Sequence, residues 1–172
     1  MHYYCLVIMP KGEMPDEDIV QELMEPGNEN LEVEAHDVEC DTCSGRGTYK
    51  SADGIAMECE DCDGTGMIQV NYNTNAWWDW YVIGGRWDGV LAGKSGGRAG
   101  IMAILENHLC APLEDNSCRV ADIVLSPERY PYAIVTPDGE VWMRGDIGHI
   151  DEERAILWRY AEHYCVVVDY HM

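Results

Sequence analysis

One short pattern of cysteine and glycine, C-x-x-C-x-G-x-G, occurs twice in the chain with only eleven residues between the copies. The first copy occupies Cys40–Gly47 and the second occupies Cys59–Gly66. Two C-x-x-C turns at this separation are a common means of placing four thiolates around one tetrahedral ion. The pattern therefore predicts a metal site, and its ligands are Cys40, Cys43, Cys59 and Cys62.

The ligand set and the repeated glycines narrow the kind of site. Four thiolates fill a tetrahedral shell, which predicts a closed, structural site. We expect one Zn²⁺ per chain, with a rubredoxin-like iron site as the alternative. In each copy the first glycine, Gly45 or Gly64, permits a bend where a Cβ atom would interfere. The last glycine, Gly47 or Gly66, is expected to let the two arms pass closely.

The length and the overall composition of the chain limit the class of protein. The chain has 172 residues, 47% of them hydrophobic, which suits one core with an inserted module. It has no apolar run of about 18 residues and no basic start before its first apolar segment, so we expect a cytoplasmic protein without a membrane partner. The other cysteines are expected to be small buried residues rather than disulfides. They are Cys5, Cys110, Cys118 and Cys165.

Runs rich in β-branched and aromatic residues predict strands at both ends of the chain and beside the cysteine motif. These runs are Tyr3–Met9, Met67–Tyr72 and Cys165–Tyr170, and the last is apolar enough for a strand buried on both faces. Residues 28–39 alternate apolar and acidic side chains and predict an edge strand. Tyr132–Gly145 contains Thr-Pro-Asp-Gly between two apolar runs and predicts a hairpin.

Helices are predicted at three places. Residues 15–27 begin with proline and acids and end at Pro-Gly. Asp151–Tyr164 has one apolar side, and Asp151 is the expected N-cap. Ile101–Cys110 is the third segment, where we favour a helix over a strand.

These elements predict an α+β fold with a mixed or antiparallel sheet, two or three helices and an inserted zinc-knuckle hairpin. We expect residues 1–38 and 67–172 to form the α+β domain. Residues 39–66 would then form the inserted zinc-binding module.

The chain is strongly acidic, with 32 Asp and Glu residues, 11 Lys and Arg residues and a formal net charge of −21 at pH 7. About half of the acids fall between Glu13 and Asp63, a segment with only two basic residues. Such a field repels nucleic acid and membranes and attracts basic proteins. Solubility alone, or adaptation to salt, would explain the same composition. The candidate partner-binding acids are Glu32, Glu34 and Glu39.

A second unusual segment, Trp77–Gly89, reads WWDWYVIGGRWDG and contains four of the six tryptophans. Apolar side chains on both faces of its first half predict a buried strand that ends at Gly84-Gly85. These glycines and the following Arg86 and Trp87 are expected to be exposed, and Arg86 and Trp87 to bind a partner, because Trp and Arg dominate interaction hot spots. Core packing in a chain without phenylalanine is the alternative.

Two resemblances extend these expectations. The copies CDTCSGRG and CEDCDGTG resemble the cysteine-rich domain of DnaJ-type chaperones, which carries four such copies and two zinc ions. This resemblance covers 27 of the 172 residues and implies a zinc-binding fold, but the chain lacks the His-Pro-Asp tripeptide of a J domain. The segments WDWYVIGGRWDG, TPDG and VVVDYHM are similar to uncharacterised bacteriophage and actinobacterial proteins, which implies a phage or mobile-element origin.

The leading hypothesis is therefore an acidic zinc-binding interaction module. If phage-encoded, it would act in the host cytoplasm as an inhibitor of a nucleic-acid-binding defence protein, the role of an anti-CRISPR protein. Its carboxylates would meet the basic surface of that host protein at phosphate positions, and the chain itself would bind no nucleic acid.

Two other functions remain open at this point. One is a small hydrolase-like enzyme with a site near Arg86, Asp169 and His171. The other is a chaperone-like peptide binder that uses a groove at the knuckles. Because the sequence contains no recognised catalytic motif, we expect a binding protein rather than an enzyme.

Overall fold

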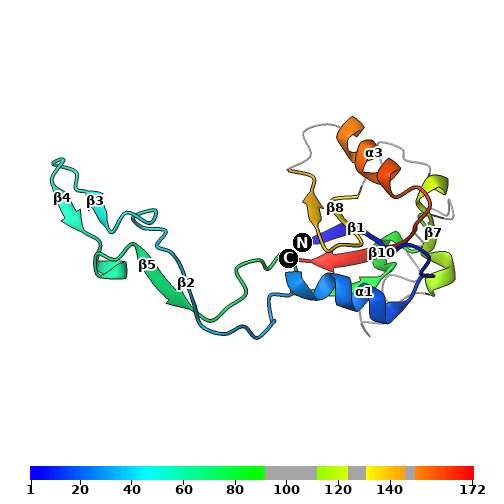
Figure 1. Cartoon of the computed structure of the whole chain (residues 1–172), viewed down its shortest axis with the longest axis horizontal. Coiled ribbons are helices and arrows are strands. Elements are labelled where there is room, and N and C mark those ends of the chain that lie inside the picture. The colour runs from blue at the N-terminus through cyan, green and yellow to red at the C-terminus, as the bar shows by residue number, and fades with distance from the viewer. Residues whose placement is uncertain (92–111, 124–130, 146–149) are drawn as a thin grey trace. The chain divides into compact units, whose positions relative to one another are not determined.

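The computed structural model describes residues 1–91, 112–123, 131–145 and 150–172 of the chain. These residues divide into two compact units (Figure 1). Residues 1–29 and 75–172 belong to the first unit and residues 30–74 to the second, which we call the cysteine unit. The predicted module at residues 39–66 lies inside the cysteine unit.

The first unit is built on a six-stranded mixed sheet in the order β6-β10-β1-β8-β9, with β7 also paired to β10. Among the described strands of this sheet, β1 and β8 run parallel and the other pairs are antiparallel. This arrangement confirms the predicted α+β class. The strands are β1 (His2–Ile8), β6 (Trp80–Ile83), β7 (Ser117–Arg119), β8 (Ala133–Val135), β9 (Val141–Met143) and β10 (Tyr164–His171).

The two long strands at the centre of this sheet, β1 and β10, carry apolar side chains on both faces. They pair along the whole length of β1, and most of their residues are buried. One face packs on helix α1 (Glu17–Met24) and the other on helix α3 (Ile150–Arg159), so each face buries its own apolar cluster (Figure 1). The continuous apolar sequence of these strands follows from burial on two sides.

Helix α1 begins where the sequence provides an N-cap. The Asp16 carboxylate accepts hydrogen bonds from the backbone amides of Asp18 and Ile19. Val20 and Met24 are buried against the sheet. A 3-10 turn, η1 (Glu25–Gly27), follows the helix and contains the predicted Pro-Gly stop.

The predicted N-cap of helix α3 is wrong. Asp151 lies inside the helix, where its carboxylate forms an ion pair with Arg154 at 3.7 Å. Ile156 and Leu157 are buried, as expected from the apolar side of this segment. The third predicted helix, Ile101–Cys110, lies outside the described residues. No helix in the described parts of the chain is long and apolar enough to cross a membrane.

The predicted hairpin is present. β8 and β9 pair antiparallel, and the Thr136 amide donates to the Glu140 carbonyl at 2.9 Å. Gly139 has a φ of +82°, which a residue with a side chain seldom adopts. The turn chemistry of Thr-Pro-Asp-Gly therefore sets this local fold.

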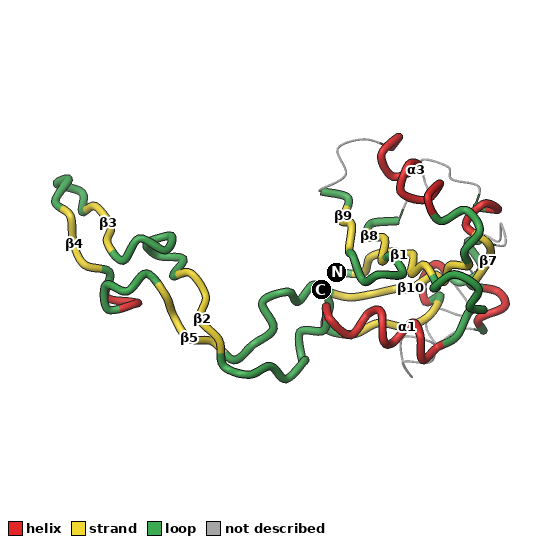
Figure 2. Tube along the Cα trace, viewed as in Figure 1, coloured by secondary structure: helices red, strands yellow, loops and turns green. Residues whose placement is uncertain are grey.

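The cysteine unit consists of two short ribbons and a 3-10 turn, η2 (Glu60–Cys62) (Figure 2). β2 (His36–Glu39) pairs with β5 (Met67–Val70), and β3 (Thr48–Lys50) pairs with β4 (Ala56–Glu58). The strand predicted for residues 28–39 begins only at residue 36. The buried cluster of this unit consists of the four motif cysteines, with Tyr49 and Ile68 packed against it.

Candidate metal centre

Each copy of the repeat folds into one tight turn. In the first copy the Gly45 amide donates to the Cys40 carbonyl at 3.1 Å. The Gly47 amide then donates to the Cys43 sulfur at 3.2 Å. An amide that donates to sulfur favours the thiolate, the form of cysteine that binds metals.

The second copy repeats these contacts nineteen residues later. The Gly64 amide donates to the Cys59 carbonyl at 3.0 Å, and the Gly66 amide donates to the Cys62 sulfur at 3.2 Å. The repeat in sequence is therefore a repeat in hydrogen bonding.

The two copies also bond to each other reciprocally. The Cys40 amide donates to the Gly66 carbonyl at 2.8 Å, and the Cys59 amide donates to the Gly47 carbonyl at 2.9 Å. Each copy thus supplies the acceptor that the other copy needs. This exchange gives a physical reason for the duplication, because a single copy would leave these backbone groups without partners.

The last glycine of each copy is required by this close approach. A Cβ atom on Gly47 would lie 2.1 Å from the Gly64 carbonyl oxygen, and one on Gly66 would lie 2.2 Å from the Gly45 carbonyl oxygen. Both glycines also have positive φ angles. The expectation that these positions let the arms pass closely agrees with this geometry.

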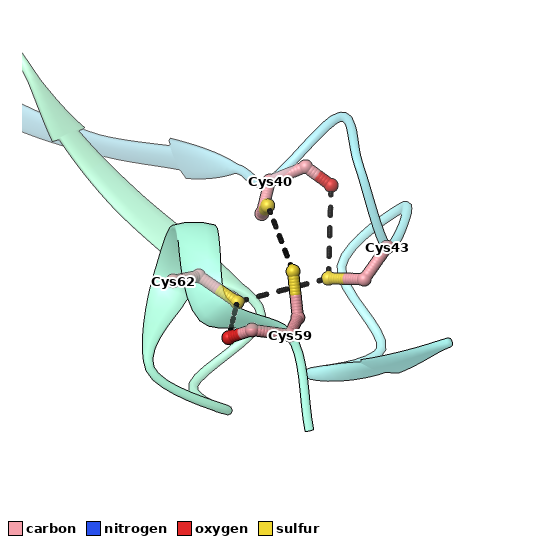
Figure 3. Close-up of side chains that lie close together, drawn as sticks. All are labelled: Cys40, Cys43, Cys59 and Cys62. Atoms are coloured by element: carbon pink, nitrogen blue, oxygen red, sulfur yellow. Dashed lines mark hydrogen bonds between the residues drawn. The ribbon is translucent and has the colours of Figure 1, made fainter. Parts of the chain in front are cut away.

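The four predicted ligands meet at one point (Figure 3). The Cys40 and Cys59 sulfurs are 3.8 Å apart, and so are those of Cys43 and Cys62. All four sulfurs lie within 4.8 Å of one another. A tetrahedral ion with Zn–S bonds of about 2.3 Å needs sulfur separations of about 3.8 Å, whereas a disulfide needs about 2.05 Å.

Burial and crowding make this cluster unsuited to four free thiolates. Burial and the neighbouring sulfurs raise the pKa of Cys59 to about 12. At Cys43 burial also raises the pKa, but hydrogen bonds from the Gly47 amide and the other cysteines bring it below its ordinary value. A divalent cation at the centre would remove this conflict, because it stabilises all four thiolates together. The site can therefore hold a metal ion, and its chemistry suits zinc.

The second cysteine of each copy is followed by a left-handed residue that the sequence did not reveal. Ser44 and Asp63 have φ angles of +50° and +47°. Such angles are uncommon for residues other than glycine, and Asp tolerates them better than most. The matching pair again obeys the nineteen-residue spacing, which is the one signal in the sequence that identifies them.

The candidate acidic residues Glu32, Glu34 and Glu39 are all exposed in the cysteine unit. Glu39 is the last residue of β2, and its carboxyl group lies against the first turn at Gly45. Glu58 takes the equivalent position at Gly64 in the second turn. The repeat thus places one carboxylate beside each turn.

A groove of about 430 Å³ opens beside the second copy. The Met57 side chain is 44% exposed, which gives the groove an apolar part. The rest of the lining comes from the motif and its acids. The lining residues are Met57, Glu58, Cys59, Glu60 and Asp63.

Most of the tryptophan segment contributes to packing within the first unit. Gly84 and Gly85 are buried, so the prediction that they are exposed is wrong. A Cβ atom on Gly85 would lie 2.3 Å from the Asp169 Cβ atom, which explains the burial. Trp87 is half-buried and stacks on Tyr4 with ring centroids 5.9 Å apart. Among Gly84, Gly85, Arg86 and Trp87, Arg86 is the exposed residue.

The residues suggested for an enzyme site take separate partners. Asp169 is fully buried, and it accepts hydrogen bonds from the Arg86 amide at 2.9 Å and pairs with His2 at 3.0 Å. His171 instead pairs with Asp79 at 2.9 Å. An Asp169–His171 pair is therefore not formed. The contact with His2 joins β1 to β10, and the contact with Asp79 joins β10 to the residue that precedes β6.

No family model matches the chain, and comparison with curated proteins and with solved structures returned no match. The functional interpretation therefore depends on the geometry and the charge of the residues themselves.

Proposed function

We propose that this chain is an acidic zinc-binding interaction module that binds a basic surface on another protein. One observation carries the proposal, namely a buried group of four cysteines in a unit whose carboxylates are all exposed. Arg46 and Lys50 are the basic residues of the cysteine unit. Its acids are Glu32, Glu34, Asp37, Glu39, Asp41, Asp53, Glu58, Glu60, Asp61 and Asp63.

The metal would act by fixing these carboxylates in space. Several of these acids lie on the two C-x-x-C turns. The backbone hydrogen bonds of these turns, together with the metal ligands, would restrict the conformation of the backbone that carries the acids. Asp61 also accepts a hydrogen bond from the Thr42 hydroxyl of the other copy at 2.5 Å. A surface ordered before binding loses less conformational entropy in the complex. Four thiolates around one divalent cation would add a net charge of about −2 to this field.

The partner that suits this surface is a protein that normally engages nucleic acid. Fixed carboxylates can occupy the positions of phosphates on a basic surface, so the two ligands would compete. We propose a host defence protein as this partner and a phage-encoded inhibitor as the role of the chain. This finer proposal rests on the resemblance to phage proteins that we expect from the tryptophan and TPDG segments.

The test is capture of a partner from host lysate, followed by association kinetics at several salt concentrations. Contacts between charged rims act mainly on the association rate. We expect high salt to slow association strongly and to change dissociation less. Glu32→Lys, Glu34→Lys and Glu39→Lys should act in the same direction. Glu152→Lys, an exposed reversal in helix α3 of the first unit, is the matched control.

Competition separates this proposal from simple solubility. Nucleic acid should displace the chain from its partner, and the chain alone should bind neither DNA nor RNA. Direct nucleic-acid binding, or a partner whose affinity is indifferent to salt, would refute the proposal.

A second candidate function is peptide binding, which the groove beside the second copy favours. Its apolar part at Met57 could accept an apolar side chain of an extended peptide. Met57→Ala should then weaken binding of unfolded polypeptides at all salt concentrations, whereas charge reversals would matter little. This pattern is the opposite of the one expected for a basic partner.

A further inference from the structure

Two cysteines outside the metal site face each other across neighbouring strands. Cys118 on β7 and Cys165 on β10 are direct register partners in the antiparallel pair. Directly opposed residues project from the same face of a sheet. Both side chains pack in the apolar cluster on the α3 side. The fold thus brings together two thiols that are far apart in sequence.

The backbone bonds define the type of pair that they occupy. The Val167 amide donates to the Asn116 carbonyl, and the Val120 amide donates to the His163 carbonyl, both at 2.9 Å. Hydrogen-bonded pairs recur at every second residue, so the cysteines between these bonds occupy one as well. The Cα atoms of such a pair lie about 5.5 Å apart, inside the range of about 4.4–6.8 Å that a disulfide spans.

The two thiols differ in access and in acidity. The Cys165 sulfur is buried and lies 3.6 Å from the Cys118 carbonyl oxygen. Cys118 is half-buried, and a hydrogen bond with the Cys165 thiol lowers the pKa of Cys118 although burial and Asp122 oppose the effect. Cys5 differs, because its burial strongly raises its pKa. A more acidic, accessible thiol beside a protected one is the usual arrangement of a reactive and a resolving cysteine.

We propose that Cys118 and Cys165 form a peroxide-sensitive thiol pair that closes into a reversible cross-strand disulfide. The Cys118 thiolate attacks one oxygen of hydrogen peroxide, the S–O bond forms, the O–O bond breaks, and the departing hydroxide takes a proton to become water. The Cys165 sulfur then attacks the sulfenic sulfur, the S–S bond forms, the S–O bond breaks, and the leaving oxygen departs as water with the thiol proton. Two thiols lose two electrons in total, and one peroxide becomes two waters.

The bond would tie β7 to the central strand β10. Disulfides of this kind in reducing compartments are transient and sensing rather than structural. A thiol reductant should therefore reopen the pair by exchange.

The test treats the full-length, zinc-loaded protein with hydrogen peroxide, then alkylates remaining thiols and maps the peptides. Digestion with trypsin and a protease that cleaves after glutamate separates Cys110 from Cys118 at Glu114. We expect a linked Cys118–Cys165 peptide that has lost two hydrogen atoms and disappears on reduction. Alkylation of Cys5 should not change. Release of metal, followed in parallel, reports any reaction at the motif cysteines.

Three variants sharpen the result. Cys165→Ala should trap Cys118 as a sulfenic acid that reacts with a 1,3-dione probe. Cys118→Ala should abolish the linked peptide and leave Cys165 reduced, and Cys110→Ser should leave the link intact. If a variant fails to fold, the wild-type map still decides. A link from Cys118 to Cys110, or separate alkylation of Cys118 and Cys165 after peroxide, would overturn the proposal.

Discussion

The first unit and the cysteine unit bury different chemistry. The first unit places Leu6, Val7 and their neighbours in two apolar clusters, one on each face of its sheet. In the cysteine unit the buried cluster consists of four cysteines, and two partly buried side chains, Tyr49 and Ile68, pack against it. The transfer of apolar surface can stabilise the first unit, but so small an apolar cluster gives the second little of this energy. We therefore expect the cysteine unit to depend on a metal ion for its stability.

The two units also differ in whether their acidic side chains are exposed or buried. Every acid of the cysteine unit is exposed, whereas the first unit buries the carboxyl groups of Glu153 and Asp169. An exposed carboxylate is hydrated to a similar extent in the folded and unfolded states, so it contributes little to stability. It remains available to bind a partner. Buried carboxylates influence stability directly. The difference suggests that the two units will respond to different perturbations.

The largest effect should follow removal of the metal. Purified protein should contain about one equivalent of zinc, and a chelator or Cys43→Ser should unfold the cysteine unit, because structural zinc contributes on the order of 10 kcal/mol in small modules. Hydrogen exchange should show lost protection in β2 and β5 and retained protection in β1 and β10. A metal content near zero with intact protection in the cysteine unit would contradict the assignment.

The next effect separates crowding from backbone conformation within the cysteine unit. Gly47 and Gly54 have similar φ angles of +71° and +77°, but a Cβ atom would collide with the Gly64 carbonyl at the first position and meet nothing within 4 Å at the second. Gly54→Ala should cost about 1–2 kcal/mol from conformation alone. Gly47→Ala should cost more than about 4 kcal/mol and should reduce metal affinity. Equal costs, measured by chelator competition and unfolding, would show that the close approach is unimportant.

A cavity in the apolar core should affect the first unit alone. Leu6 is fully buried, and Leu6→Ala should destabilise this unit by about 3 kcal/mol. The zinc content should remain unchanged, because none of the ligands belongs to this cluster. Ile55→Ala, an exposed truncation in the cysteine unit, is the control. Loss of zinc in Leu6→Ala would mean that the two units do not fold independently.

The features that could be predicted from the sequence depend on residues that are close together along the chain. The spacing of the cysteines, the Thr-Pro-Asp-Gly hairpin and the strands β1 and β10 all depend on neighbouring residues or on a continuous apolar run. The nineteen-residue repeat was sufficient to predict all four residues that meet at the candidate metal centre. Its cause, the reciprocal bonds between copies, became evident only from the fold.

Long-range packing explains what could not be predicted. The parallel pairing of β1 with β8 joins segments more than a hundred residues apart. Gly85 looked like an exposed turn, but Asp169 on β10 packs against it. Similarly, Asp169 and His171 were assigned to one candidate enzyme site, yet His2 contacts the first and Asp79 contacts the second. No local sequence pattern predicts any of these contacts.

The smallest expected effect tests the buried charge of the first unit. Glu153 on helix α3 is 6% exposed, and burial raises the pKa of its carboxyl group although Arg144 lowers it in part. Because the folded-state pKa is the higher one, the folded protein holds this proton more tightly than the unfolded chain does. The contribution to stability is complete below the ordinary value of 4.5 and is lost as the pH rises through the raised value.

Glu153→Gln removes this dependence, because a neutral amide of similar shape carries no charge to desolvate. The variant should match the wild type in acid and exceed it by about 1 kcal/mol near neutral pH, measured by urea unfolding across the pH range. Glu152→Gln removes the same charge from an exposed position of the same helix and should show no such trend. A gain that is constant with pH would instead assign the effect to packing, and the contrast between buried and exposed acids would lose its support.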